Sequence, residues 1–162
     1  MKLSKEEFIA FNSPIGMIRV FEVNGKVSAL DIAVSGVRAT KSQSPVLIQA
    51  QKELEAYFAG KLTKFTFPID MSKGTDFQKS VWKEIGKIKF GQVKTYADIA
   101  KAIGKPLAAR AVGGAVGSNP IPLVVGCHRV LGSSGQITGY SGGKGIPTKR
   151  ILSKLEGISS KE

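Results

Sequence analysis

The first 60 residues carry short apolar runs that are typical of β-strands. These runs are residues 8–11, 15–23 and 26–33. Asn24-Gly25 separates the last two, and such a pair favours a tight hairpin turn because both central positions need a positive φ angle. Apolar positions then recur on one side of residues 45–58, and Gly60 follows as a stop, which predicts one helix. The pattern therefore predicts a small sheet with one helix.

A break over residues 68–74 predicts the end of this first part, because a proline, a glycine and polar side chains interrupt the apolar pattern there. A chain of 162 residues can form one ordinary domain or two small ones. We therefore predict a scaffold domain over residues 1–70 and a second domain over residues 71–162. We find no catalytic constellation in the first.

Capping patterns, prolines and glycine stops predict four helices in the second domain. They begin after Thr75, after Thr95, near Leu107 and at Pro147. The second ends near Ile103, and a tight turn with Gly104 joins it to the third, which makes the pair a helix-turn-helix candidate. The third helix, residues 107–116, is mostly alanine and glycine. Residues this small suit either close approach to a nucleic-acid backbone or packing against another helix.

The basic residues are concentrated in the second domain. Residues 1–70 hold 9 basic and 7 acidic side chains, whereas residues 71–162 hold 15 and 5. This bias favours an acidic polymer as partner, with nucleic acid ahead of a membrane because no basic amphipathic anchor is visible. No apolar run approaches the length of a membrane span and no signal peptide follows Met1, so we expect a soluble intracellular protein.

The chain has one cysteine and one histidine, and they are adjacent, at Cys127 and His128. Their segment, residues 124–130, is apolar and β-branched, which predicts a short buried strand. One cysteine excludes an internal disulfide. One cysteine and one histidine cannot fill a tetrahedral zinc shell without several carboxylates, so no metal is expected.

Two interpretations of Cys127 remain open at this point. A free cysteine is often a small buried hydrophobe. It becomes a nucleophile only as the thiolate, which an imidazole or a cation nearby favours, and His128 and Arg129 are of these types. Neighbours on a strand point to opposite faces, so a bend or a bridging water would have to connect Cys127 with His128. Glu156 ends the last helix, where the helix dipole disfavours a carboxylate, and this suggests that His128 is its partner.

Six short segments of the second domain form an ordered set. They are Thr95-Tyr96, Arg110–Gly114, Asn119-Pro120, Cys127–Val130, Gly139–Gly143 and Leu155–Gly157. In order and spacing they resemble the DNA alkyltransferases that repair 6-O-alkylguanine, also called methylated-DNA:protein-cysteine methyltransferases. The resemblance covers most of residues 75–157. Residues 1–70 resemble the N-terminal domain of that family only in size and coarse pattern.

The resemblance implies an α+β fold, in which a small N-terminal sheet and helix form a ribonuclease-H-like scaffold. A mainly helical, winged helix-turn-helix-like domain follows and binds double-stranded DNA in the minor groove. A damaged guanine is rotated out of the stack into a pocket. The expected protein is a cytoplasmic monomer, nuclear if eukaryotic, without a cofactor or a membrane partner.

The resemblance also implies a DNA-repair methyltransferase that acts once. Its Cys127 takes the alkyl group irreversibly from 6-O-alkylguanine, with 4-O-alkylthymine as a further candidate, while His128, a water and Glu156 draw off the thiol proton. The other implied catalytic residues are Tyr96, a proton donor to the base, and Asn119. Implied DNA contacts are Arg110, which fills the gap in the stack, Ala111, Gly113, Thr95 and Arg129. The implied pocket consists of Tyr96, Val130, Tyr140, Ser141 and Gly142.

One position departs from the family pattern, because Gly126 stands where the family has a proline before the cysteine. Glycine adds conformational freedom at a cost of about 0.5–1 kcal/mol in an ordered strand, so we expect a less firmly aimed sulfur. Two competing hypotheses remain. A helix-turn-helix protein could bind DNA or the lesion without chemistry, and Cys127→Ala would then leave the phenotype unchanged. A cysteine hydrolase using Cys127 and His128 would turn over an ester repeatedly.

Overall fold

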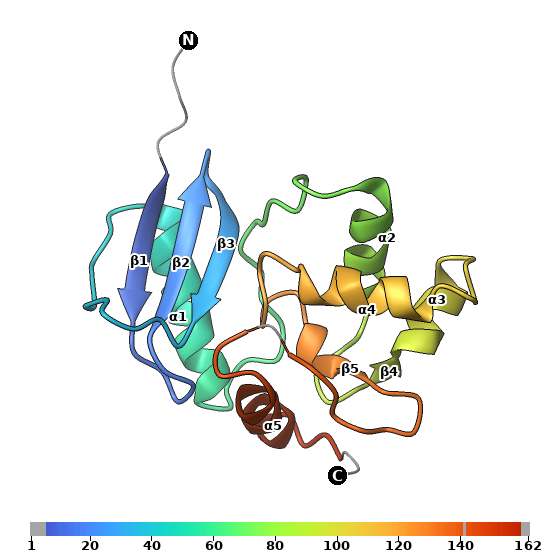
Figure 1. Ribbon diagram of the computed structural model, residues 1–162. Coiled ribbons are helices and arrows are strands. Elements are labelled where there is room, and N and C mark those ends of the chain that lie inside the picture. The colour runs from blue at the N-terminus through green and yellow to red at the C-terminus, as the bar shows by residue number, and fades with distance from the viewer. Residues whose placement is uncertain (1–5, 141, 160–162) are drawn as a thin grey trace. The chain divides into compact units, whose positions relative to one another are not determined.

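The computed structural model describes residues 6–140 and 142–159. The chain divides into two compact units, Met1–Asp70 and Met71–Glu162. The first holds a three-stranded sheet and one helix, and the second is mainly helical with a two-stranded sheet (Figure 1). The α+β class predicted from the sequence is confirmed. Among the described residues, no helix is both long and apolar enough to cross a bilayer.

The sheet of the first unit is antiparallel, in the order β1-β2-β3. Its strands are Glu7–Phe11 (β1), Ile18–Val23 (β2) and Lys26–Ile32 (β3). The hairpin between β2 and β3 is formed by Asn24 and Gly25 with φ angles of 53° and 79°, as their sequence predicts. Figure 1 shows the helix α1, Pro45–Phe58, packed along one face of this sheet. The Ser44 side chain accepts a hydrogen bond from the Leu47 amide and caps its start.

The segment predicted as a linker, residues 68–74, is partly bound to the first unit. The Val27 amide donates to the Pro68 carbonyl at 3.0 Å, and the Asp70 amide donates to the Val27 carbonyl at 2.8 Å. These bonds extend the edge of β3 with a parallel bridge between Val27 and Ile69. The sequence shows where the composition changes. It does not predict the extra strand pairing, because that pairing depends on the unpaired edge of β3.

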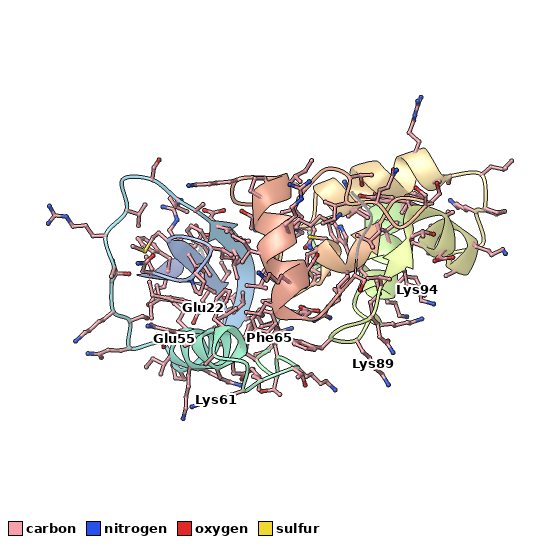
Figure 2. The ribbon with its side chains drawn as sticks, turned by 90° about the horizontal axis from the view of Figure 1, so that it is seen from below. Glu22, Glu55, Lys61, Phe65, Lys89 and Lys94 are labelled. Atoms are coloured by element: carbon pink, nitrogen blue, oxygen red, sulfur yellow. The ribbon has the colours of Figure 1, made fainter. Side chains whose placement is uncertain are left out.

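The described residues of the second unit form four helices, one 3-10 turn and two short strands. They are Asp76–Ile85 (α2), Lys94–Thr95 (β4), Tyr96–Ala102 (α3), Ala109–Gly117 (α4), Cys127–Arg129 (η1), Val130–Leu131 (β5) and Ile146–Leu155 (α5). Both predicted capping boxes are present, and they start α2 and α3. The strands β4 and β5 pair in parallel. Lys89 and Lys94 extend into solvent from the segment between α2 and the end of β4 (Figure 2).

The helix α4 has two different faces, one packed and one open. Val112, Ala115 and Val116 are buried, and the Trp82 indole nitrogen donates to the Ala115 carbonyl at 2.8 Å. On the other side Arg110 and Ala111 are exposed, and a Cβ added at Gly114 or Gly117 would meet nothing within 4 Å. The small residues of α4 therefore pack on one face of the helix and leave the other face open. The helix also starts later than predicted, since Leu107 is fully exposed before it.

The buried face of α5 differs from its apolar stripe. The sequence pattern favours Ile151, Leu152 and Leu155 as the inward side, but Ile151 is 44% exposed. The buried residues of α5 are Thr148, Lys149, Leu152 and Ser153. Leu152 is common to both sets, so the buried face is rotated away from the apolar stripe and not reversed. Two of the buried polar side chains have partners there, since Oγ1 of Thr148 accepts from the Lys144 amide at 2.9 Å and Lys149 donates to two backbone carbonyls described in the next section. The Ser153 hydroxyl has no partner among the described residues.

Gly74 is the position in this fold where a small side chain matters most for packing. A Cβ there would lie 2.5 Å from Cζ3 and 2.6 Å from Cη2 of Trp82, whose indole is fixed by its bond to Ala115. We expect Gly74→Ala to lower the free energy of unfolding by about 1–3 kcal/mol through overpacking. Denaturant unfolding measures this. Gly86→Ala is the matched control, since a Cβ there meets only ordinary contacts; equal effects of the two would contradict the packing argument.

Candidate active site around Cys127

Cys127 lies in a turn and not in the strand that its apolar neighbours predict. It opens the 3-10 turn η1, after Gly126 with φ −71° and ψ 58°. The Cys127 amide donates to the Val125 carbonyl at 2.7 Å, and the Arg129 amide donates to the Gly126 carbonyl at 2.9 Å. The β-branched run predicts burial correctly but not conformation, because these local hydrogen bonds replace a strand partner. The bend that the side chains of Cys127 and His128 require is thus present.

A cavity of about 300 Å³ opens over the cysteine. It is lined by Tyr96, Gly113, Val116, Gly117, Cys127, Gly139 and Tyr140. The Cys127 side chain is almost completely buried, so its sulfur is reached through this cavity. The Tyr96 hydroxyl lies 2.9 Å from Oγ1 of Thr138, a contact that holds the ring beside the pocket loop. The cavity is large enough for a small planar ligand.

Three buried charged or polar side chains meet behind the turn. Nε2 of His128 lies 2.6 Å from Oε2 of Glu156. Arg129 donates from Nε to Oε1 of Glu156 at 2.8 Å and from Nη2 to Oε2 at 3.1 Å, and its Nη1 donates to the Ile88 carbonyl at 2.7 Å. The Gly91 amide also donates to Oε1 at 3.2 Å. The contact between His128 and Glu156 suggested by the sequence is therefore made.

Burial sets the protonation of the two central residues. It lowers the pKa of His128 below 6.5 despite the adjacent Glu156 carboxylate, and the charges of Arg129 and Lys149 act in the same direction as burial. Burial also raises the pKa of the Cys127 thiol, against hydrogen bonds from the Asn119 and Tyr140 side chains and the charge of Lys149. At neutral pH the resting site thus holds a thiol and a neutral imidazole.

The neutral imidazole has a defined orientation. With Nε2 bonded to the Glu156 carboxylate, the ring carries its proton on Nε2, and Nδ1 becomes an acceptor. Nδ1 is buried and has no hydrogen-bond partner among the described residues. A buried acceptor of this kind needs a donor, such as an ordered water.

Asn119 connects the end of α4 to the cysteine turn. Its amide nitrogen donates to the Val125 carbonyl at 2.8 Å, and its side-chain oxygen accepts from the Ile121 amide at 3.0 Å. Its side chain also hydrogen-bonds Cys127, which favours the thiolate. Asn119 thus shapes the turn on both sides of the sulfur.

The remaining predicted site residues lie in different parts of the second unit, as far as the structure describes them. Arg110 and Ala111 are exposed on α4, and Gly113 lines the cavity. The Thr95 hydroxyl caps α3 by accepting from the Asp98 amide. Val130 and Gly142 are buried without lining the cavity, and Ser141 lies outside the described residues. Arg129, predicted to contact DNA, uses its guanidinium inside the protein, so we assign it to holding Glu156 instead.

Sequence reasoning missed Lys149. This side chain of α5 is fully buried, and its Nζ donates to the Val130 carbonyl at 2.6 Å and to the Gly139 carbonyl at 3.4 Å. Burial lowers its pKa from 10.5 to about 8. A signal was present, since Lys149 stands three residues before Leu152 and seven before Glu156, which places all three on one side of the helix. The site has no metal-like cluster: among the described residues no group of three His, Cys, Asp or Glu side chains could hold an ion.

Two family models match the chain. The model described as 6-O-methylguanine DNA methyltransferase, DNA binding domain, matches residues 76–158, and that described as 6-O-methylguanine DNA methyltransferase, ribonuclease-like domain, matches residues 8–71. A methylated-DNA–protein-cysteine methyltransferase of Mycolicibacterium paratuberculosis is 40% identical over 154 residues, 93% of this chain and 92% of the relative. One of Methanosarcina barkeri is 52% identical over 108 residues, 67% of this chain. That match spans 66% of the relative's own length, just under two thirds.

Solved structures agree with these matches. The O6-methylguanine methyltransferase of Mycobacterium tuberculosis has a TM-score of 0.83 and 38% identity, with 98% of this chain and 97% of that chain covered. The M. tuberculosis OGT in complex with DNA has a TM-score of 0.81 and 41% identity, with 93% and 92% covered. Both comparisons extend over both units of the chain.

The protonation of His128 can be measured directly, because the chain has a single histidine. We expect the NMR spectrum of the folded protein to show a neutral imidazole with its proton on Nε2 at pH 7, and a pKa below 6.5. The unfolded chain then binds more protons than the folded one just below pH 6.5, so stability falls as the pH drops through that range. The urea-unfolded protein is the control, and a charged imidazole in the folded protein at pH 7 would refute this assignment.

Proposed function

This chain belongs to the 6-O-methylguanine DNA methyltransferase family, and we propose that it repairs DNA by moving the alkyl group of 6-O-alkylguanine onto Cys127. Each molecule acts once, because the thioether product has no ready route of cleavage. We propose a monomer that needs no cofactor, since the cysteine itself accepts the alkyl group. The observation that carries this proposal is the cavity over the buried sulfur, backed by the His128–Glu156 contact. A lesion-binding protein without chemistry is less supported, since the sulfur itself lines the cavity.

The reaction is a displacement at the alkyl carbon. A water that donates to the free Nδ1 of His128 would accept the thiol proton of Cys127 and pass one to the ring, whose positive charge Glu156 stabilises. The thiolate then attacks, a carbon–sulfur bond forms, and the bond from carbon to the guanine oxygen breaks. Tyr96, at the cavity wall, supplies a proton to the departing guanine. Asn119 keeps the sulfur aimed through its bonds to the turn.

The identity of the base depends on the walls of the cavity. Tyr96 and Tyr140 lie on it and can stack on or hydrogen-bond a flipped purine. A purine extruded from a duplex brings no charge into this site, which suits a cavity lined by glycines, Val116 and two tyrosines beside the cysteine. We assign 4-O-alkylthymine as a second, smaller substrate on the same grounds.

The DNA surface in this proposal is the open face of α4. Its exposed small residues let the helix approach a narrow groove, and Arg110 is the long side chain on that face. Thr95, at the start of α3, is a further polar contact that we propose for the duplex. The excess of basic residues in this unit attracts the duplex without regard to sequence. The first unit, with nearly balanced charge, acts as a scaffold.

Mass spectrometry tests the chemistry. Incubation with duplex DNA that contains 6-O-methylguanine should add one methyl group to the Cys127 peptide and leave guanine in the DNA, in equal amounts. Cys127→Ser is the control. This variant should gain no methyl group, because a serine hydroxyl is not ionised at neutral pH. An unmodified peptide together with an intact lesion would refute alkyl transfer. Removal of more methyl groups from the DNA than there are protein molecules would refute the single turnover.

Arg110→Ala tests the role of α4 in base flipping. The variant should react about tenfold more slowly with 6-O-methylguanine in duplex DNA but at the normal rate with the free base, because only the duplex must be held open. Lys61→Ala removes the same charge from an exposed position in the first unit and serves as the matched control (Figure 2). Equal losses on duplex and free base would remove the flipping role from Arg110.

A further inference from the structure

The Tyr96 hydroxyl forms a hydrogen bond with a threonine of the loop beside the cavity. Its oxygen lies 2.9 Å from Oγ1 of Thr138, and Thr138 directly precedes Gly139. Tyr96, at the start of α3, and Gly139 both line the cavity over Cys127. The bond therefore joins two separate segments of the cavity wall.

The backbone holds both partners of this bond in place. Tyr96 directly follows β4 and the loop of Thr138 directly follows β5, and these two strands pair in parallel (Figure 1). The loop is closed by a hydrogen bond from the Gly132 amide to the Gln136 carbonyl at 2.8 Å. Cγ2 of Thr138 packs against the start of the loop, since it would lie 3.1 Å from a Cβ placed on Gly132. The fold thus sets the distance between the two hydroxyls.

The direction of this hydrogen bond matters for the chemistry, and either oxygen can be the donor. A phenol has one proton, so a Tyr96 hydroxyl that donates to Thr138 has none left for a bound base. In the proposed reaction Tyr96 supplies its proton to the departing guanine. The bond is compatible with that step only if Thr138 donates and the phenol oxygen accepts.

We propose that Thr138 is a positioning residue for alkyl transfer, whose hydroxyl donates to the Tyr96 oxygen and turns the phenolic proton toward the cavity. As the bond from the alkyl carbon to the guanine oxygen breaks, this proton passes from Tyr96 to guanine, and the phenolate later regains a proton from water. A hydrogen bond to the developing phenolate is stronger in the transition state than in the resting site, so it lowers the barrier. The inference rests on the proposed function, because Thr138 acts through Tyr96.

The test compares two reactions of Cys127 that differ in their leaving group. Methyl transfer from 6-O-methylguanine in duplex DNA, followed in a single turnover at saturating DNA, needs a proton for the departing base. Alkylation by iodoacetamide releases iodide, which needs none. Thr138→Val removes the hydroxyl but keeps the methyl group that packs on Gly132, so it should slow methyl transfer about tenfold and leave alkylation by iodoacetamide unchanged.

Further variants separate positioning from a structural role. Thr138→Ser retains a donor and should react at close to the wild-type rate. Thr63→Val makes the same change at an exposed position of the first unit and should alter neither reaction. In a Tyr96→Phe background, Thr138→Val should have no further effect, because the hydroxyl that Thr138 orients is already absent.

A wild-type rate of methyl transfer in Thr138→Val would overturn the proposal. A faster rate would do so as well, because Thr138 would then be an acceptor that competes for the phenolic proton. Equal slowing of both reactions, or slowing that persists in the Tyr96→Phe background, would show a structural role instead. Thr138→Ala decides if the valine variant does not fold.

The proposed function has its own outcome in the same experiment. Wild-type protein that takes no methyl group would refute alkyl transfer, and the role of Thr138 with it. Wild-type protein that reacts beside a Thr138→Val variant of equal rate would refute Thr138 alone, so the two failures are distinct.

Discussion

The buried Glu156 carboxylate is the constraint on which the second unit depends. It accepts hydrogen bonds from His128, Arg129 and the Gly91 amide, and so joins α5 to the cysteine turn and to the segment before β4. Removing one partner of a buried charge leaves the other uncompensated, at a cost of about 3–5 kcal/mol. The same carboxylate fixes the tautomer of His128. Fold stability and the orientation of the proposed base are therefore set by one group.

Much of the fold follows from local signals in the sequence. The capping boxes at Thr75 and Thr95 determine where α2 and α3 begin, because each pairs a side chain with a backbone amide three residues away. Asn24-Gly25 determines the hairpin between β2 and β3 in the same way, through φ angles that few other residues adopt. These elements are predictable because the atoms that decide them are close in the chain.

The parts that sequence reasoning missed depend on distant partners. The apolar residues around Cys127 indicate burial, but the turn at Gly126 follows from hydrogen bonds that no pattern displays. Arg129 and Lys149 would be placed at the surface by charge alone, and they are buried because Glu156 and two backbone carbonyls receive them. Cys127, His128 and Glu156 were found because the first two are unique in the chain and the third stands at the wrong end of a helix dipole.

The helix α4 contributes to the cavity and to the open surface at once, since Gly113 and Gly117 line the first while Arg110 and Gly114 lie on the second. A side chain introduced on this helix to narrow or reshape the cavity would also thicken the surface that we propose for the duplex. Engineering that seeks to accept bulkier adducts would then trade one property against the other. Gly139 and Tyr140 border the cavity from a separate loop, and they are where the two traits can be tuned independently.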